Sequence, residues 1–314
     1  MRHVFRGLPA SHQRVDCALA IGNFDGVHRG HQQLLKMVCE AARQRHLASA
    51  VLTFEPHPRE YFGDESLVRI STLRDKVNAI VSCGIERVYI LPFDAALAGL
   101  SAKDFVEKIL CGGLACRWVT VGENFQFGAR RSGDVKALET LAAACGAEAV
   151  CTPLVLEADE RISSTRVRDA MQAGDLAAVA ALLGRPYTVT GHVIHGAQLG
   201  RTLDFPTLNM AFTPQGSKAG CALHGSFAVR IRGLKPEGVP CGGVASMGYK
   251  PTVTNEKRWL LETHVFDYAG DAYGKLLQVE FVQKLRDERK FESLTALKDA
   301  IAADACKARE ILGL

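Results

Sequence analysis

Residues 17–31 read CALAIGNFDGVHRGH, and this stretch indicates the fold of the first half of the chain. Its first six residues, 17–22, form a short apolar run of the kind that becomes a buried strand. A glycine-containing turn interrupts the run, and a helical pattern follows over 30–46. A strand, a turn and a helix in this order are typical of an α/β domain.

The same alternation continues to residue 183. Further strands are predicted at 48–53, 86–91, 117–122 and 147–152, and helices at 73–83, 102–111, 133–145, 164–173 and 175–183. Asp175 is placed to cap the last of these helices. We therefore expect an α/β fold with a parallel sheet and helices on both of its faces.

The pattern changes after Arg185 and Pro186. The following runs are β-rich and are separated by turns that contain glycine or proline; they are 187–194, 225–232, 258–267 and 276–284. A helical period returns over 293–312. We expect an antiparallel β-barrel with a C-terminal helix, and two domains that span residues 1–185 and 186–314.

Composition excludes several classes of protein. The 314 residues are 47% hydrophobic and 23% charged, which excludes a mainly disordered chain. A net charge of only +4 argues against a dedicated nucleic-acid binder. Ten cysteines form no C-x-x-C pair, so we expect reduced thiols in the cytoplasm. No signal peptide and no apolar run of about 20 residues occurs, so no membrane association is expected.

The turn after the first predicted strand contains His28, Gly30 and His31. In a parallel α/β sheet this position lies beside a helix N-terminus, whose free N–H groups and positive dipole suit phosphate. The chain has neither a P-loop sequence nor G-x-G-x-x-G. Two histidines three residues apart are also compatible with a zinc site, or with ordinary capping or core-edge residues.

Three other strings also follow predicted strands or open a helix. His57 lies in TFEPHP (53–58), and Asn124 lies in GENFQFG (122–128). The string ISSTRVR (162–168) offers hydroxyl groups and two arginines at a helix start, although alone it is equally a helix cap with a solvated basic face. Together the strings gather hydrogen-bond donors and cations around one strand-end crevice.

These four strings, in this order, resemble the HIGH-type nucleotidyltransferases, and more closely the adenylyltransferase module of prokaryotic bifunctional riboflavin kinase/FAD synthetases. The resemblance implies the reaction FMN + ATP → FAD + pyrophosphate, with His28, His31 and Arg166 acting on the ATP phosphates. The other residues that it places at the nucleotide or flavin are Gly22, Phe24, Gly30, His57, Asn124, Ser164, Thr165 and Arg168.

In the second half, the string GHVIHGAQLGRTLDFPTLN (191–209) combines tight glycine turns with Thr207 and Asn209, whose oxygens suit Mg²⁺. A glycine-rich hairpin with a proline-capped edge is the alternative interpretation. The string GVASMGYKPT (243–252) predicts another turn. Strand alternation places Leu260, Glu262 and His264 on one face, so Glu262 is either a solvated carboxylate or a general base.

These strings are similar to the riboflavin kinase module of the same family. The similarity implies that Thr207 and Asn209 hold Mg²⁺-ATP and that Glu262 takes the proton of the riboflavin 5′-hydroxyl. It also places Gly196, Gly200 and Arg201 at the nucleotide. The chain departs from the usual family pattern at Asp204, Leu208, Phe227 and Ser246.

The expected ligands are therefore riboflavin, FMN, FAD and ATP with Mg²⁺. Two alternatives remain at this stage. The departures are compatible with a flavin-binding regulatory module that has lost kinase activity, beside an active FMN adenylyltransferase. A transferase of the same fold with another substrate is the second alternative, although the motifs of the second half argue against it. The oligomeric state cannot be read from the sequence.

Overall fold

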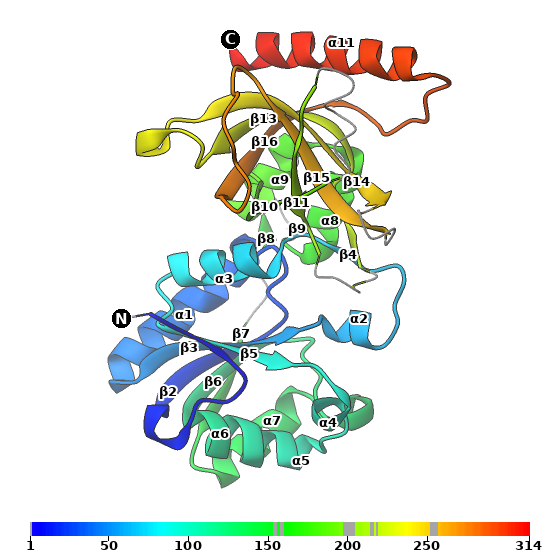
Figure 1. Cartoon of the computed structure of the whole chain (residues 1–314). Helices are drawn as coiled ribbons and strands as arrows, with labels where there is room; N and C mark the ends of the chain where they lie inside the picture. Colours follow the sequence, from blue (N-terminus) through cyan, green and yellow to red (C-terminus); the bar gives the residue numbers. More distant parts are fainter. Residues whose placement is uncertain are drawn as a thin grey trace. The chain divides into compact units, whose positions relative to one another are not determined.

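The computed structural model describes residues 2–152, 156–157, 160–196, 205–213, 217, 219–251 and 257–314 (Figure 1). The chain packs into two compact units, Met1–Asp64 with Lys76–Ser163, and Glu65–Asp75 with Ser164–Leu314. This grouping rests on packing alone, and the predicted division after residue 185 stays a prediction.

The first unit contains a six-stranded parallel sheet in the order β1-β5-β3-β2-β6-β7. Its strands are β1 (His3–Arg6), β2 (Cys17–Ile21), β3 (Ala48–Glu55), β5 (Arg87–Pro92), β6 (Cys116–Gly122) and β7 (Glu148–Thr152). The central strands are apolar because both faces are covered, and Leu19, Leu52 and Val119 have no exposed surface. The parallel sheet predicted from the sequence is confirmed, and only the edge strand β1 was missed.

Helices cover both faces of this sheet. In Figure 1, α1 (Arg29–Arg45) lies on one face, and α5 (Ala102–Asp104), α6 (Gly112–Leu114) and α7 (Val135–Ala144) lie on the other. The predicted helix 102–111 continues from α5 into a π-helical turn, η2 (Phe105–Cys111). The remaining helical elements are η1 (Ser11–Gln13), α2 (Pro58–Tyr61), α3 (Leu73–Ser82), α4 (Ala95–Ala98) and η3 (Ala129–Arg131).

The second unit contains a closed barrel in the order β10-β11-β15-β14-β13-β16, in which all neighbouring strands are antiparallel. Its strands are β10 (Thr188–Ile194), β11 (Leu208–Ala211), β13 (Gly225–Arg232), β14 (Cys241–Pro251), β15 (Lys257–Val265) and β16 (Leu276–Arg286). This unit also contains the helices α8 (Ser164–Ala173), α9 (Leu176–Leu183), η4 (Pro236–Gly238) and α11 (Leu294–Leu312), and the short strand pair of β4 (Val68–Arg69) with β12 (Gly220–Cys221). The short pair of β8 (Leu156–Glu157) with β9 (Glu160–Arg161) belongs to the first unit. The predicted antiparallel barrel with a C-terminal helix is confirmed.

The prediction of a turn over 243–252 is wrong for residues 243–251, which belong to β14, and residue 252 lies outside the described residues. At Gly243 close packing leaves no room for a side chain, because a Cβ would meet the backbone carbonyl of His264 first. A Cβ at Gly243 would lie 2.9 Å from the side chain of Ile231, and a Cβ at Gly248 would lie 2.7 Å from a carboxylate oxygen of Glu288. A strand that must admit close neighbours is therefore as rich in glycine as a turn.

Helix α11 is fixed to the barrel by a buried carboxylate. Asp304, only 7% exposed, accepts a hydrogen bond from the Ser226 hydroxyl (2.9 Å) and pairs with the guanidinium of Arg286 (2.8 Å). Beside it, Ala308 packs against Ala228 of β13.

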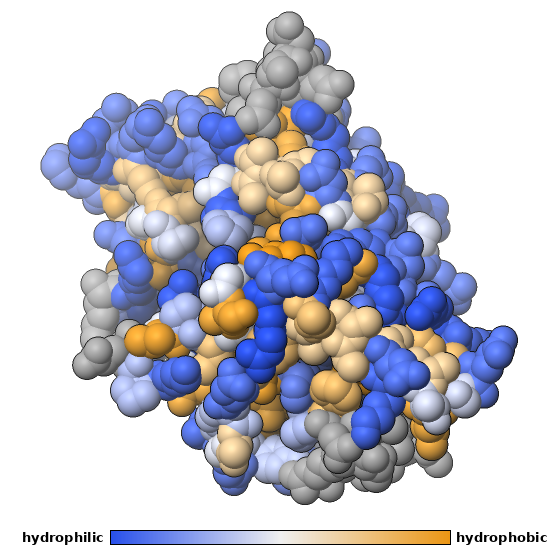
Figure 2. Space-filling model, turned by 90° about the horizontal axis from the view of Figure 1, so that it is seen from above, coloured by the Kyte–Doolittle hydropathy of each residue, from blue (hydrophilic) through white to orange (hydrophobic). Residues whose placement is uncertain are grey.

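Hydrophilic and hydrophobic side chains intermingle over the face shown in Figure 2. Among the described residues, no helix is long and apolar enough to cross a membrane.

Candidate active sites

The loop between β2 and α1 has a strained backbone that burial holds in place. Phe24 and Val27 have left-handed φ angles of 50° and 45°, which side chains other than glycine rarely adopt. Phe24 is 1% exposed and Val27 is fully buried. Strain of this kind persists only where the surrounding structure fixes it, and it is common at functional sites.

This loop ends in the two predicted histidines, which the structure brings together. His28 caps α1, and its Nδ1 accepts a hydrogen bond from the backbone N–H of His31 at 3.3 Å. The two imidazole rings stack at 3.7 Å between centroids, with an angle of 16° between their planes. Because Nδ1 of His28 is an acceptor, its proton is on Nε2, where it is a hydrogen-bond donor. Two imidazoles at a helix N-terminus suit an anionic ligand.

Two predicted glycines leave room for aromatic rings. A Cβ at Gly22 would lie 3.2 Å from the Phe24 ring. A Cβ at Gly30 would lie 3.2 Å from the His28 ring and 3.3 Å from the carbonyl oxygen of Ile162. The Phe24 side chain is thus buried against its own loop, so only its backbone is able to face a ligand. The contact at Ile162 brings the chain back to the histidine loop two residues before α8 begins.

His57 and Asn124 follow the C-terminal ends of β3 and β6, which lie on either side of β2 in the sheet. His57 is 8% exposed and caps α2, because its Nδ1 accepts a hydrogen bond from the backbone N–H of Arg59 at 3.1 Å. Asn124 is exposed in the turn after β6. Both residues therefore lie at the sheet edge that carries the histidine loop, although the side chain of His57 is occupied by its capping role.

An aromatic cluster at the same edge was missed by the sequence analysis. It consists of Tyr61, the last residue of α2, Phe62, which follows it, and Phe93, which follows β5. The Phe62 ring lies 5.1 Å from that of Tyr61 and 5.8 Å from that of Phe93, yet Phe62 is 70% exposed. The signal was available in the sequence, where two aromatic residues follow the TFEPHP string. An exposed aromatic cluster at a strand end is suited to stacking on a planar ligand.

The predicted residues of α8 belong to the second compact unit. Thr165 is exposed, and Ser164 and Arg166 are partly buried. Arg168 donates a hydrogen bond from Nε to the carbonyl oxygen of Val68 at 2.6 Å, so part of its guanidinium is already occupied by β4. Their contact with a nucleotide stays a prediction.

In the barrel, Glu262 of β15 lies directly between two residues of neighbouring strands. It pairs with Asn209 of β11 on one side and with Ser246 of β14 on the other. Directly paired residues of adjacent strands present their side chains on the same face. Leu261 and Thr263 are 0% and 1% exposed, whereas Glu262 is partly exposed, as the predicted alternation requires.

Asn209 and Gly196 form one packed arrangement. Asn209 is 5% exposed, and its Oδ1 has no hydrogen-bond partner among the described residues. A Cβ at Gly196 would lie 2.5 Å from Cγ of Asn209, so this glycine admits the carboxamide. Three residues of the predicted segment, Gly200, Arg201 and Asp204, lie outside the described residues.

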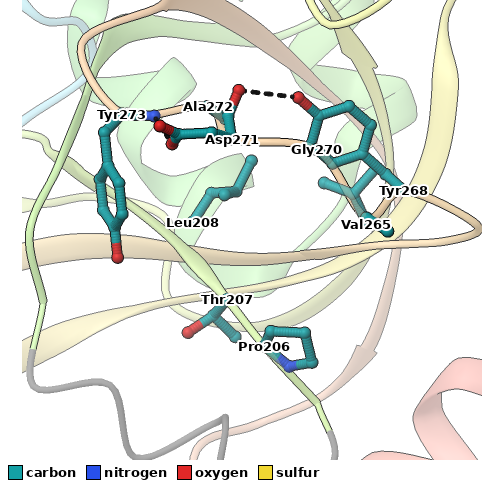
Figure 3. A pocket seen from close by; sticks show the side chains of 10 residues that line it. Pro206, Thr207, Leu208, Val265, Tyr268, Gly270, Asp271, Ala272 and Tyr273 are labelled. Carbon is teal, nitrogen blue, oxygen red and sulfur yellow. Dashed lines mark hydrogen bonds between the residues drawn. The ribbon is translucent and has the colours of Figure 1, made fainter.

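A pocket of about 790 Å³ opens beside Thr207. Figure 3 shows Pro206 and Thr207 on one side and the turn of residues 268–273 on the other. That turn is held by its own hydrogen bonds: the hydroxyl of Tyr268 donates to the carbonyl of Asp271 (3.1 Å), and the N–H of Tyr273 donates to the Asp271 carboxylate (3.0 Å). The pocket is large enough for a nucleotide.

Three of the four departures from the family pattern lie within the described residues, and the structure shows where each one lies. Leu208 lines this pocket, and Ser246 lies opposite Glu262. Phe227 is fully buried and packs edge-on against Phe281 at 5.2 Å between centroids. Phenylalanine therefore suits this core position, because it has no hydroxyl group that would need a buried hydrogen-bond partner.

Comparisons with known proteins cover nearly the whole chain. The FAD synthetase family matches residues 10–166, and the riboflavin kinase family matches residues 183–312. A bifunctional riboflavin kinase/FMN adenylyltransferase of Escherichia coli K12 is 41% identical over 299 residues, which are 95% of this chain and 93% of the relative. The protein of that description from Bacillus subtilis 168 is 33% identical over 303 residues, 93% of this chain and 91% of the relative.

A solved structure also matches along the full length. A crystal structure titled a macrolide-efflux protein from Streptococcus pneumoniae has a TM-score of 0.72 and 25% sequence identity, and the match covers 96% of this chain and 97% of that chain. The fold, the order of the two matched regions and the identity to relatives over nearly their full length all agree. The chain belongs to the bifunctional riboflavin kinase/FMN adenylyltransferase family.

Proposed function

We propose that this chain makes both flavin cofactors from riboflavin. The barrel catalyses riboflavin + ATP → FMN + ADP, and the α/β unit catalyses FMN + ATP → FAD + pyrophosphate. The observation that carries this proposal is the match of both enzyme families to one chain, in the order 10–166 and 183–312. All ten cysteines are free thiols, which supports a reducing cytoplasmic setting.

In adenylyl transfer, a phosphate oxygen of FMN attacks the α-phosphorus of ATP, and pyrophosphate leaves. The nucleophile is already an anion, so the protein has no proton to remove. Its work is to position the phosphates and to stabilise their charge. The Nε2–H of His28, the stacked ring of His31 and the N-terminus of α1 are the donors that we assign to this role.

The residues of α8 complete this assignment. We assign Ser164, Thr165, Arg166 and Arg168 to the triphosphate, because hydroxyl groups and guanidinium groups bind phosphate oxygens. The hydrogen bond from Nε of Arg168 to the carbonyl of Val68 restricts the orientation of its guanidinium. Gly22, Gly30 and Asn124 shape the space around the nucleotide.

The aromatic cluster of Tyr61, Phe62 and Phe93 is our candidate for the flavin ring. FMN carries a flat, apolar ring system, and exposed aromatic side chains bind such rings by stacking. Among the described residues of the first unit, Phe62 is the most exposed large hydrophobic side chain. The sheet places this cluster after β3 and β5, at the edge where the histidine loop follows β2.

In the kinase reaction, Glu262 acts as the general base. An alcohol is a poor nucleophile until its proton leaves, so the carboxylate takes the proton of the riboflavin 5′-hydroxyl as the oxygen attacks the γ-phosphorus. ADP is the leaving group. The pocket beside Thr207 holds the nucleotide. Because Gly196 has no side chain, the carboxamide of Asn209 is able to pack against its backbone.

Thr207 and Asn209 fit a magnesium ion. Both supply neutral oxygen atoms, and Oδ1 of Asn209 is buried without a hydrogen-bond partner among the described residues. Mg²⁺ is commonly bound by one or two protein oxygens together with substrate phosphates and water. When bound, the ion neutralises charge on the phosphates that the kinase must approach.

Two single variants test the division of labour. His28→Ala is expected to stop FAD formation but not FMN formation, and Glu262→Gln is expected to stop FMN formation but not FAD formation from supplied FMN. A mixture of the two variants should then convert riboflavin to FAD, because FMN diffuses from one protein to the other. Loss of both reactions in one folded variant, or no FAD from the mixture, would contradict the proposal. A wild-type protein that makes FAD only from supplied FMN would instead support the regulatory alternative.

A further inference from the structure

The first unit contains a buried lysine that the chemistry above does not use. Lys76 of α3 is 6% exposed. Its ammonium group donates hydrogen bonds to the hydroxyl of Thr53 at 3.3 Å and to the carbonyl of Phe54 at 3.2 Å. The carboxylate of Glu55 lies 4.0 Å away. All three partners are at the C-terminal end of β3, at the edge of the sheet where the histidine loop begins.

Thr53 links Lys76 to the histidine loop through hydrogen bonds. Its hydroxyl, in a residue with no exposed surface, donates a hydrogen bond to the carbonyl of Asn23 at 3.2 Å. An ammonium group is only a donor, so Thr53 must accept from Lys76, and its own proton is then free for Asn23. Lys76, Thr53 and Asn23 therefore form a directed chain of hydrogen bonds.

Asn23 occupies a critical place in the loop. It follows Gly22 at the end of β2 and precedes Phe24, the first of the two strained residues. A carbonyl held at this point restricts how the loop relaxes toward an unstrained backbone, and the loop ends at His28. An apolar side chain in place of Lys76 would fill the same space without the cost of burying an ammonium group, so packing alone does not account for a lysine here.

We propose that Lys76 is a positioning residue for adenylyl transfer, which acts through Thr53 and Asn23 to hold the loop that carries His28. The inference rests on the proposed function. Lys76 contacts no reacting atom in this role. Its effect is to keep the histidine pair in the geometry that the phosphates require.

The sharpest test removes the hydroxyl of Thr53 and leaves its volume. Thr53→Val is expected to lower kcat for FAD formation by about ten- to a hundredfold, the scale expected for a misplaced catalytic group. Thr53→Ser keeps the hydroxyl and should keep most of the activity. Thr120→Val is the matched control, because Thr120 is also fully buried in this sheet but its hydroxyl bonds to Thr152.

Lys76→Met supplies the second measurement. It should lower kcat as Thr53→Val does, with KM for FMN little changed, and the double variant should be no slower than the slower single variant because the two residues act as one unit. FMN formation and the thermal unfolding midpoint are measured on the same samples. If wild-type protein forms FAD and Thr53→Val matches both Thr53→Ser and Thr120→Val, the inference is wrong. If wild-type protein forms no FAD at all, the proposed function itself fails.

Discussion

Replacement of Gly196 by alanine tests whether the kinase site depends on the position of Asn209. The added Cβ would lie 2.5 Å from Cγ and 2.8 Å from Oδ1 of that carboxamide. Its Nδ2 would lie closer still, so to reach the 3.4 Å at which ordinary contacts begin the carboxamide must retreat by about 1 Å. A displacement of about 1 Å in a positioned group costs about a hundredfold in rate. We therefore expect FMN formation to fall by about a hundredfold in Gly196→Ala.

The assay follows FMN formation from riboflavin, ATP and Mg²⁺, and FAD formation from supplied FMN in the same preparation reports on the intact α/β unit. Gly191→Ala is the matched control, because a Cβ there would meet its nearest neighbour, Met210, at an ordinary 3.6 Å. Equal kinase rates in Gly191→Ala, Gly196→Ala and wild-type protein would refute the assignment of Asn209 to the site.

Three further variants test other parts of the account. His31→Ala should lower kcat for FAD formation by about 10²–10³-fold, as expected for a lost donor to a charged transition state, and an unchanged rate with supplied FMN would remove His31 from the site. Phe62→Ala should raise KM for FMN by about fivefold, equivalent to about 1 kcal/mol of lost stacking, while KM for ATP stays constant; a change in KM for ATP alone would count against a flavin role. Asp304→Ala should lower the stability of the barrel by about 2 kcal/mol, because it leaves the buried Ser226 hydroxyl without its acceptor and Arg286 without its partner, and urea unfolding curves that overlay those of wild-type protein would show that α11 is held by other contacts.

Much of the fold was predictable because its elements have simple periodicities. The helix predicted at 164–173 and the strand predicted at 225–232 have the same bounds in the structure. The family resemblance that the motifs predicted is confirmed by the matched families and relatives. Strand β14 was read as a turn because glycine is ambiguous in a single sequence. It marks both a turn and a strand position that a neighbouring atom approaches closely.

The placement of the candidate site residues was predictable only where they are close in sequence or share a strand. His28 and His31 lie within one helical turn, and strand alternation placed Glu262 correctly. The bond between Lys76 and Thr53 joins residues 23 positions apart, and it exists only because α3 packs against the sheet. Burial of the Phe24 ring likewise depends on the three-dimensional path of its loop, which no local pattern records.

The most direct test of the central claim is a time course with wild-type protein, riboflavin, ATP and Mg²⁺, in which FMN and FAD are separated and quantified. If one chain performs both reactions, FMN appears first and then declines as FAD accumulates. Riboflavin that stays unchanged in the presence of protein that does convert supplied FMN to FAD would contradict the claim that the barrel is a kinase.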